Sequence, residues 1–150
     1  MSKKVILLVE DNADDELFTV TALRENNIVN EIVVARNGVE ALDYLFGTGQ
    51  YAGRDTSALP QVVLLDLKLP KLDGREVLRR LRADARTKAL PVVILTSSKE
   101  EQDLAVTYQL GCNSFIRKPV DFEQFAAVIH QLKLYWLVLN EPPPPNGRPG

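Results

Sequence analysis

Four short stretches of the sequence place polar side chains that could act on phosphate directly after runs of apolar residues. They are Glu10-Asp11, Asp66, Thr96 and Lys118-Pro119. Clustered carboxylates repel one another unless a cation lies among them, and Mg²⁺ prefers one or two carboxylates together with a phosphate. A carboxylate can also attack a phosphoryl group and form an aspartyl phosphate. A lysine ammonium and a threonine hydroxyl can bind phosphoryl oxygens, so these side chains, if brought together, predict a site that accepts phosphate.

Each of these polar residues follows a segment that has the composition of a buried strand. Short apolar runs are typical of parallel strands buried on both faces, and five are expected, at residues 5–9, 31–35, 62–66, 92–95 and 112–117. Helical patterns alternate with them around residues 13–26, 41–46, 75–83, 99–110 and 121–140. Asn12 and Asp121 are suited to cap the first and last of these helices. Residues 47–60 have turn composition and are expected to form a long surface loop.

This alternation predicts an α/β fold, a doubly wound five-stranded parallel sheet with helices on both faces. Right-handed crossovers leave few topologies, and the strand order 2-1-3-4-5 of flavodoxin-like proteins is a common one. In that order, Glu10-Asp11 and Asp66 flank the crevice between the first and third strands. Thr96 and Lys118 end the fourth and fifth strands on the same edge, so all these side chains should meet.

The same residues, in this order at these strand ends, resemble the receiver domain of two-component response regulators over about residues 4–140. The resemblance implies that Asp66 accepts a phosphoryl group from a histidine kinase. Thr96 would move toward that group, and Lys118 would bind it. Phe115 matches the aromatic position that changes rotamer with the threonine, although plain core packing explains a strand aromatic equally well. The Lys118-Pro119 peptide bond is cis in the family.

The resemblance also implies a metal site and a more specific type of regulator. Asp11, Asp66 and the Lys68 carbonyl would bind Mg²⁺ directly, and Glu10 would act mainly through water. The segment Val-Glu-Asp-Asn at residues 9–12, the long 47–60 loop and the segment 115–125 resemble the small stand-alone regulators that pair with bacterial phytochromes. A phytochrome-type histidine kinase is therefore the expected partner.

The last helix carries two apolar stripes at helical spacing. One stripe is expected to face the core and consists of Phe122, Phe125, Ala126 and Ile129. The other is expected to form a homodimer and consists of Val128, Leu132, Tyr135 and Leu139, with Trp136 beside them. A helix that packs only within its own domain is the alternative.

Composition and charge limit the remaining functions. With 150 residues, a net charge of −2 and Cys112 as the only cysteine, the chain is expected to be cytoplasmic and to have no disulfide. No membrane segment is expected, and the basic residues between 71 and 88 are interpreted as a solvated helix face rather than a nucleic-acid surface. We expect one receiver domain at residues 1–140, a Pro-rich mobile tail at 141–150 and no output domain.

Two other functions suit the same fold. A phosphohydrolase with an aspartyl nucleophile would need an acid close to Asp66 to protonate the leaving group, whereas Lys68 stands two residues after it. A flavin-binding module would need a Gly/Ser/Thr-rich loop after the first strand, where Glu10-Asp11 would repel phosphate. The expected protein is therefore a phosphoacceptor switch, enzymatic at most in slowly losing its own phosphoryl group.

Overall fold

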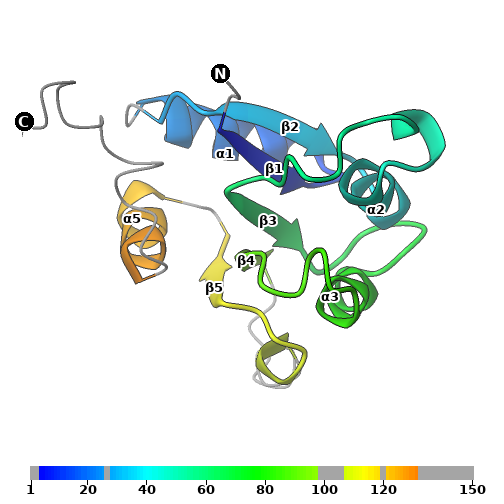
Figure 1. The fold of residues 1–150 in the computed structure, drawn as a ribbon. Coiled ribbons are helices and arrows are strands. Elements are labelled where there is room, and N and C mark those ends of the chain that lie inside the picture. The colour runs from blue at the N-terminus through cyan, green and yellow to red at the C-terminus, as the bar shows by residue number, and fades with distance from the viewer. Residues whose placement is uncertain (1–3, 26–27, 98–106, 119–120, 132–150) are drawn as a thin grey trace, which may run out of the picture.

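The structure is a computed structural model that describes residues 4–25, 28–97, 107–118 and 121–131. Its elements follow the expected alternation of strands and helices (Figure 1): β1 Val5–Val9, α1 Ala13–Glu25, β2 Glu31–Ala35, α2 Gly38–Phe46, the 3₁₀ turn η1 Gly49–Tyr51, β3 Val62–Asp66, α3 Gly74–Ala83, β4 Val92–Thr96, β5 Ser114–Arg117 and α5 Phe122–Gln131. The helix expected at residues 99–110 lies largely outside the described residues, although residues 107–109 are helical.

The five strands form one parallel sheet in the order β2-β1-β3-β4-β5, as the sequence predicted. In register, Val9 pairs with Leu65, Asp66 pairs with Leu95, and Thr96 pairs with Arg117. The strands β1, β3 and β4 are almost wholly buried, which agrees with their continuous runs of Val, Ile and Leu.

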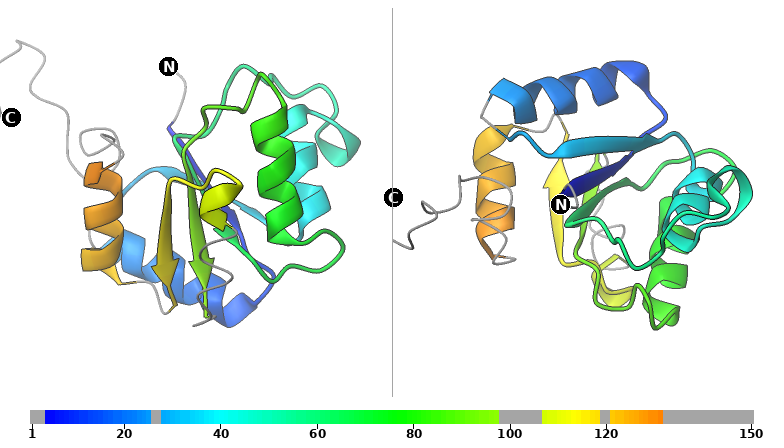
Figure 2. Two further views of the ribbon diagram at one scale, coloured as in Figure 1. Left: turned by 90° about the horizontal axis from the view of Figure 1, so that it is seen from below. Right: turned by 45° about the horizontal axis from the view of Figure 1, so that its top comes forward.

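Helices cover both faces of the sheet, as Figure 2 shows: α1 and α5 lie on one side, and α2 and α3 on the other. Alternate residues of each strand therefore enter different cores. Leu7, Val63 and Ile94 pack toward α2 and α3. Leu8, Leu64 and Leu95 pack toward α1 and α5. Because both faces are filled, the polar ends of the strands are left as the place where a site can form.

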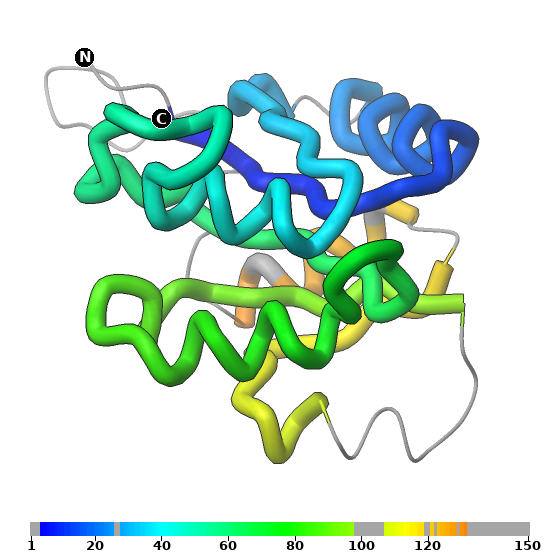
Figure 3. Tube along the Cα trace, turned by 90° about the vertical axis from the view of Figure 1, so that its right-hand side faces the viewer, coloured from blue at the N-terminus to red at the C-terminus, as the bar shows by residue number. Residues whose placement is uncertain are grey.

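The carboxyl ends of the strands meet at one edge of the sheet. Figure 3 shows β1 and β4 running in the same direction, and the chain leaves both strands on the same side. Side-chain caps start the helices that follow: Asn12 Oδ1 accepts from the Asp15 amide (2.9 Å), Asp73 Oδ1 from the Arg75 amide (2.8 Å) and Asp121 Oδ1 from the Gln124 amide (2.8 Å). The caps expected at Asn12 and Asp121 are confirmed.

The 47–60 segment is less open than its composition suggested. It contains η1, and the Tyr51 ring meets the buried Tyr44 ring edge to face at 5.2 Å. The Arg54 guanidinium lies 4.1 Å from the centre of the Tyr44 ring, and Arg54 Nη1 donates to the Ala58 carbonyl (3.1 Å). Aromatic and cation–π contacts thus hold this loop on α2.

The last helix differs from the expected pattern at one position. Val128 was assigned to the partner-facing stripe, and that assignment is wrong, because Val128 is only 7% exposed and packs with Phe125 in the α1 and α5 core. The two residues are three apart and so share one helix face. Leu132, Tyr135, Trp136 and Leu139 lie outside the described residues, as do the side chains of Phe122 and Ile129.

One arginine joins three segments at the amino ends of β4 and β5. Arg82, near the end of α3, donates to the carbonyls of Gly111 (2.8 Å) and Leu90 (2.8 Å) and to Asn113 Oδ1 (2.9 Å). Asn113 Oδ1 also accepts from the Val92 amide (2.8 Å).

Within the described part of the chain, the structure contains no helix that is long and apolar enough to cross a lipid bilayer.

Candidate functional site

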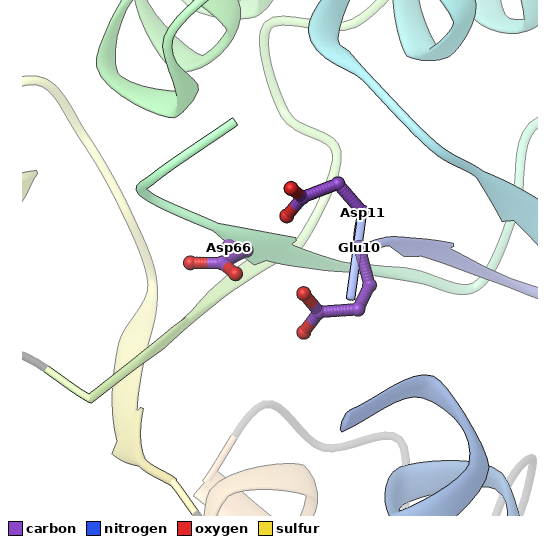
Figure 4. A group of neighbouring side chains, drawn as sticks. All are labelled: Glu10, Asp11 and Asp66. Carbon is purple, nitrogen blue, oxygen red and sulfur yellow. The ribbon is translucent and has the colours of Figure 1, made fainter. Parts of the chain in front are cut away.

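Three carboxylates gather at the carboxyl edge of the sheet. Glu10 and Asp11 follow β1, Asp66 ends β3, and oxygens from all three lie within 4.8 Å of one another. Figure 4 shows the Glu10 and Asp11 carboxylates turned toward the side on which Asp66 lies. Glu10 is fully buried and Asp66 is 6% exposed, whereas Asp11 is open to solvent. The predicted convergence of these acids is therefore present in the structure.

Lys118 brings the balancing positive charge from the end of β5. Its Nζ donates to Asp66 Oδ2 at 2.8 Å and to Asp15 Oδ2 at 2.9 Å. The same nitrogen lies 2.6 Å from Glu10 Oε1 as an ion pair that lacks hydrogen-bond geometry. The Lys118 amide donates to the Thr96 carbonyl (2.8 Å), which fixes the backbone from which this side chain reaches the acids.

Burial and neighbouring charges both shift the pKa values of Glu10 and Lys118. Burial is the largest reason that the pKa of Glu10 is raised to about 7; the neighbouring Asp66 adds to the rise, and Lys118 opposes it. Burial alone would lower the pKa of Lys118, but its contacts with Asp66, Glu10 and Asp15 outweigh burial, so the pKa lies above its ordinary value. Lys118 therefore stays a cation, and the buried acids depend on it.

The backbone after β3 holds the Asp66 carboxylate in place. The Lys68 amide donates to Asp66 Oδ1 (3.1 Å), and the Gly74 amide donates to the Leu67 carbonyl (3.0 Å). Gly74 is the first residue of α3, and a Cβ built on it would lie 2.3 Å from the Asp66 carbonyl oxygen. Only glycine allows α3 to begin this close to the strand end.

The other predicted site residues lie at or near the same edge. Thr96 ends β4, is 1% exposed and is paired in register with Arg117. Phe115 in β5 is partly buried against the α2 and α3 core. The Lys68 side chain is exposed, and its amide contacts Asp66 as described. Pro119 lies outside the described residues.

The sequence analysis did not include Asp15 in the site. Asp14, Asp15 and Glu16 all lie in the first turn of α1, where acidic residues favour the helix dipole, and nothing in their spacing distinguishes one of them. The structure distinguishes Asp15, because its carboxylate reaches Lys118 across 103 residues of chain. The available signal in the sequence was a helix that begins at Ala13, two residues after the acid pair.

The acid cluster fits a hard divalent cation. All of its potential ligands are oxygens, which Mg²⁺ and Mn²⁺ prefer. Glu10 Oε1 is buried and has no hydrogen-bond donor among the described residues. The Lys118 ammonium lies 2.6 Å from this oxygen as an ion pair, so it is the set of oxygen donors that supports a metal site.

Comparison with known families and proteins gives consistent matches. The family described as "Response regulator receiver domain" matches residues 6–130. The chain is 40% identical over 141 residues to the probable methanogenesis regulatory protein FilR2 of Methanothrix harundinacea, covering 94% of this chain and 88% of that protein. It is 36% identical over 134 residues to response regulator Rcp1 of Synechocystis, covering 89% of each.

Solved structures match over similar lengths. The bacteriophytochrome response regulator AtBRR has a TM-score of 0.84 and 52% identity, with 94% of this chain and 100% of that chain covered. The Mn²⁺-bound form of Rcp1 has a TM-score of 0.73 and 33% identity, with 92% of this chain and 96% of that chain covered. The relatives thus match nearly the whole length of this chain, and the two solved structures share its fold.

Proposed function

The chain belongs to the response regulator receiver family, and on that premise we propose that it is a phosphoacceptor switch in which Asp66 receives a phosphoryl group from a histidine kinase. The observation that supports this most directly is the position of Lys118 Nζ, 2.8 Å from Asp66 Oδ2 in a largely buried acid cluster. Acceptance of a phosphoryl group is general in the family. The role of Asp66 in this chain is the specific proposal.

The transfer step follows from the contacts of Asp66. A carboxylate oxygen of Asp66 attacks the phosphorus of a phosphohistidine, the phosphorus–nitrogen bond breaks, and its electron pair returns to the imidazole, which takes up a proton from solvent. Lys118 then binds a phosphoryl oxygen. Thr96, at the neighbouring strand end, is the proposed hydroxyl donor to another oxygen, and Phe115 is proposed to move with it.

We propose that Asp11, Asp66 and the Lys68 carbonyl hold Mg²⁺ directly and that Glu10 acts through water. Bound there, the ion would neutralise charge that develops on the phosphoryl oxygens. The Mn²⁺-bound form of Rcp1 is a related structure that carries a divalent ion. The oxygens of Glu10, Asp11 and Asp66, which lie within 4.8 Å of one another, support the same assignment in this chain.

A phytochrome-type histidine kinase is the proposed partner. AtBRR, which is 52% identical to this chain, is a bacteriophytochrome response regulator, and this supports the assignment. On α1, Leu17 and Phe18 are 66% and 54% exposed in the turn after Asp15, and a partner helix could cover such apolar side chains. Phe18→Ser should slow transfer from the kinase and leave phosphorylation by a small-molecule donor unchanged; equal slowing with both donors would contradict this.

The remaining proposals concern the end of the chain. A homodimer through Leu132, Tyr135, Trp136 and Leu139 remains a proposal, now without Val128, and residues 141–150 are proposed to be a Pro-rich tail outside the receiver domain. Sedimentation at high micromolar concentration, with and without a phosphate mimic, tests the dimer. A monomer under both conditions would reject it.

The decisive experiment is incubation with acetyl phosphate and Mg²⁺, followed by intact mass measurement and an assay for free phosphate. One added phosphate that Asp66→Asn abolishes and Asp55→Asn retains supports the switch, since Asp55 is an exposed carboxylate of the 47–60 segment. Sustained release of phosphate with turnover would favour the phosphohydrolase. No adduct under any metal condition would overturn the proposal.

A further inference from the structure

Asp15 is a third acidic partner of Lys118 and comes from a helix rather than from a strand end. Its Oδ2 lies 2.9 Å from Lys118 Nζ, and its side chain is 43% exposed, whereas that of Lys118 is 11% exposed. The Asn12 cap holds the Asp15 amide (2.9 Å) and so fixes the first turn of α1 against the site. We propose that Asp15 competes with the phosphoryl group for the Lys118 ammonium and thereby disfavours the phosphorylated state. This inference rests on the proposed function.

The carboxylates around Lys118 create the competition. An ammonium group has three N–H donors. Lys118 Nζ donates to Asp66 and Asp15 and also lies beside Glu10 as an ion pair. A phosphoryl oxygen on Asp66 that binds Lys118 must therefore compete with these carboxylates for the ammonium group. Glu10 is fully buried, so giving up its contact with Lys118 would be costly. Asp15 is the most exposed of the three, and its carboxylate is the one that water can take over.

Charge acts in the same direction as competition. The incoming donor and the transferred phosphoryl group are anions. Asp15 places a further negative charge beside Lys118, next to the position where these anions would bind. Removing that charge lowers the repulsion and also releases Lys118. Both effects favour the phosphorylated state, so the direction of the change does not depend on their relative sizes.

The opposite role for Asp15 would be to position Lys118 for transfer. In that case, loss of the carboxylate would let the ammonium turn away from Asp66, and phosphorylation would slow. The contacts with Asp66 and Glu10 argue against this, because they hold Nζ in the cluster without help from α1. The two roles therefore predict changes of opposite sign.

The test compares Asp15→Asn with Asp14→Asn, which removes the same charge from the same helix turn. The rate of phosphorylation by acetyl phosphate with Mg²⁺ and the Kd of beryllofluoride, a phosphoryl mimic, are measured at low and high salt. Asp15→Asn should raise the rate and tighten the mimic about two- to fivefold relative to Asp14→Asn, with a smaller ratio at high salt. Asp15→Glu should return both values toward those of the wild type.

Equal values for Asp15→Asn and Asp14→Asn at low salt would overturn the inference and show only a general charge effect. Slower phosphorylation in Asp15→Asn would also overturn it and assign Asp15 to positioning. A wild-type protein that takes up no phosphate is a different result, because it would reject the proposed function itself. Unfolding curves for all three variants confirm that folded proteins are compared.

Discussion

Replacing Gly74 by alanine tests how closely α3 must approach the strand that carries Asp66. The added Cβ would lie 2.3 Å from the Asp66 carbonyl oxygen and 2.8 Å from Leu67 Cα, whereas ordinary contacts begin at 3.4 Å. Both neighbours are backbone atoms, so no side chain can turn aside. The strand end or the start of the helix must therefore move by about 1 Å.

Two effects of Gly74→Ala on stability oppose each other. Alanine is favoured over glycine in a helix by up to about 1 kcal/mol, and by less in the first turn. Forcing extra atoms into a packed site costs about 1–3 kcal/mol, and more where backbone must shift. The clash should win, so the free energy of unfolding should fall by about 1–3 kcal/mol. A nucleophile displaced by 1 Å can lose on the order of 10²-fold in rate, so phosphorylation of Asp66 should slow at least tenfold.

Urea unfolding measures the first effect, and intact mass after timed incubation with acetyl phosphate measures the second. Gly53→Ala is the control, because a Cβ there meets nothing within 4 Å, although its φ of +91° costs about 1–2 kcal/mol for any other residue. The control should lose stability and keep its phosphorylation rate. A Gly74→Ala protein with wild-type stability and rate would refute the reasoning, since it would mean that the site accepts the methyl group without displacement.

Three further predictions concern other parts of the molecule. Arg82→Ala should lower the free energy of unfolding by about 2–4 kcal/mol, because several carbonyls lose their donor, whereas Arg79→Ala on the same helix should change it little; equal effects in urea titrations would contradict this. Asp11→Asn should stabilise the metal-free protein by about 0.5–2 kcal/mol and abolish the rise in melting temperature with Mg²⁺. A lower melting temperature for the metal-free variant would oppose the predicted like-charge strain. Burial raises the pKa of the Cys112 thiol, so iodoacetamide at pH 8 should modify it at least tenfold faster in urea than in the native protein; similar rates would show that the thiol is accessible.

The fold could be predicted from sequence because each strand of the central sheet is an unbroken apolar run. Residues 5–9, 62–65 and 92–95 are all apolar, so these strands have no polar face. This is typical of parallel strands covered on both faces. General rules of handedness and connection then left few strand orders, and the observed order is a common one. Glu10, Asp11 and Asp66 could be placed together because the carboxyl ends of parallel strands share an edge.

The features that escaped prediction depend on how helices face the sheet. The residues that follow Phe125 carry apolar side chains at more than one helical spacing, and only packing shows that Val128 shares the core face. Asp15 is one of three neighbouring acids, and only the direction in which α1 leaves β1 brings its carboxylate to Lys118. The spacing of apolar residues identifies the faces of a helix, but it does not show which face packs against the sheet.

The two ends of the sheet are held by different kinds of interaction. At the amino ends of β4 and β5, the Arg82 guanidinium donates to backbone carbonyls and to Asn113 Oδ1, which also accepts from the Val92 amide. At the carboxyl ends, the segments are held by opposite charges around Lys118. An added phosphoryl group would therefore rearrange contacts at the carboxyl ends of the strands and leave those at the amino ends in place. Amide exchange should change near Thr96 and remain slow at Val92.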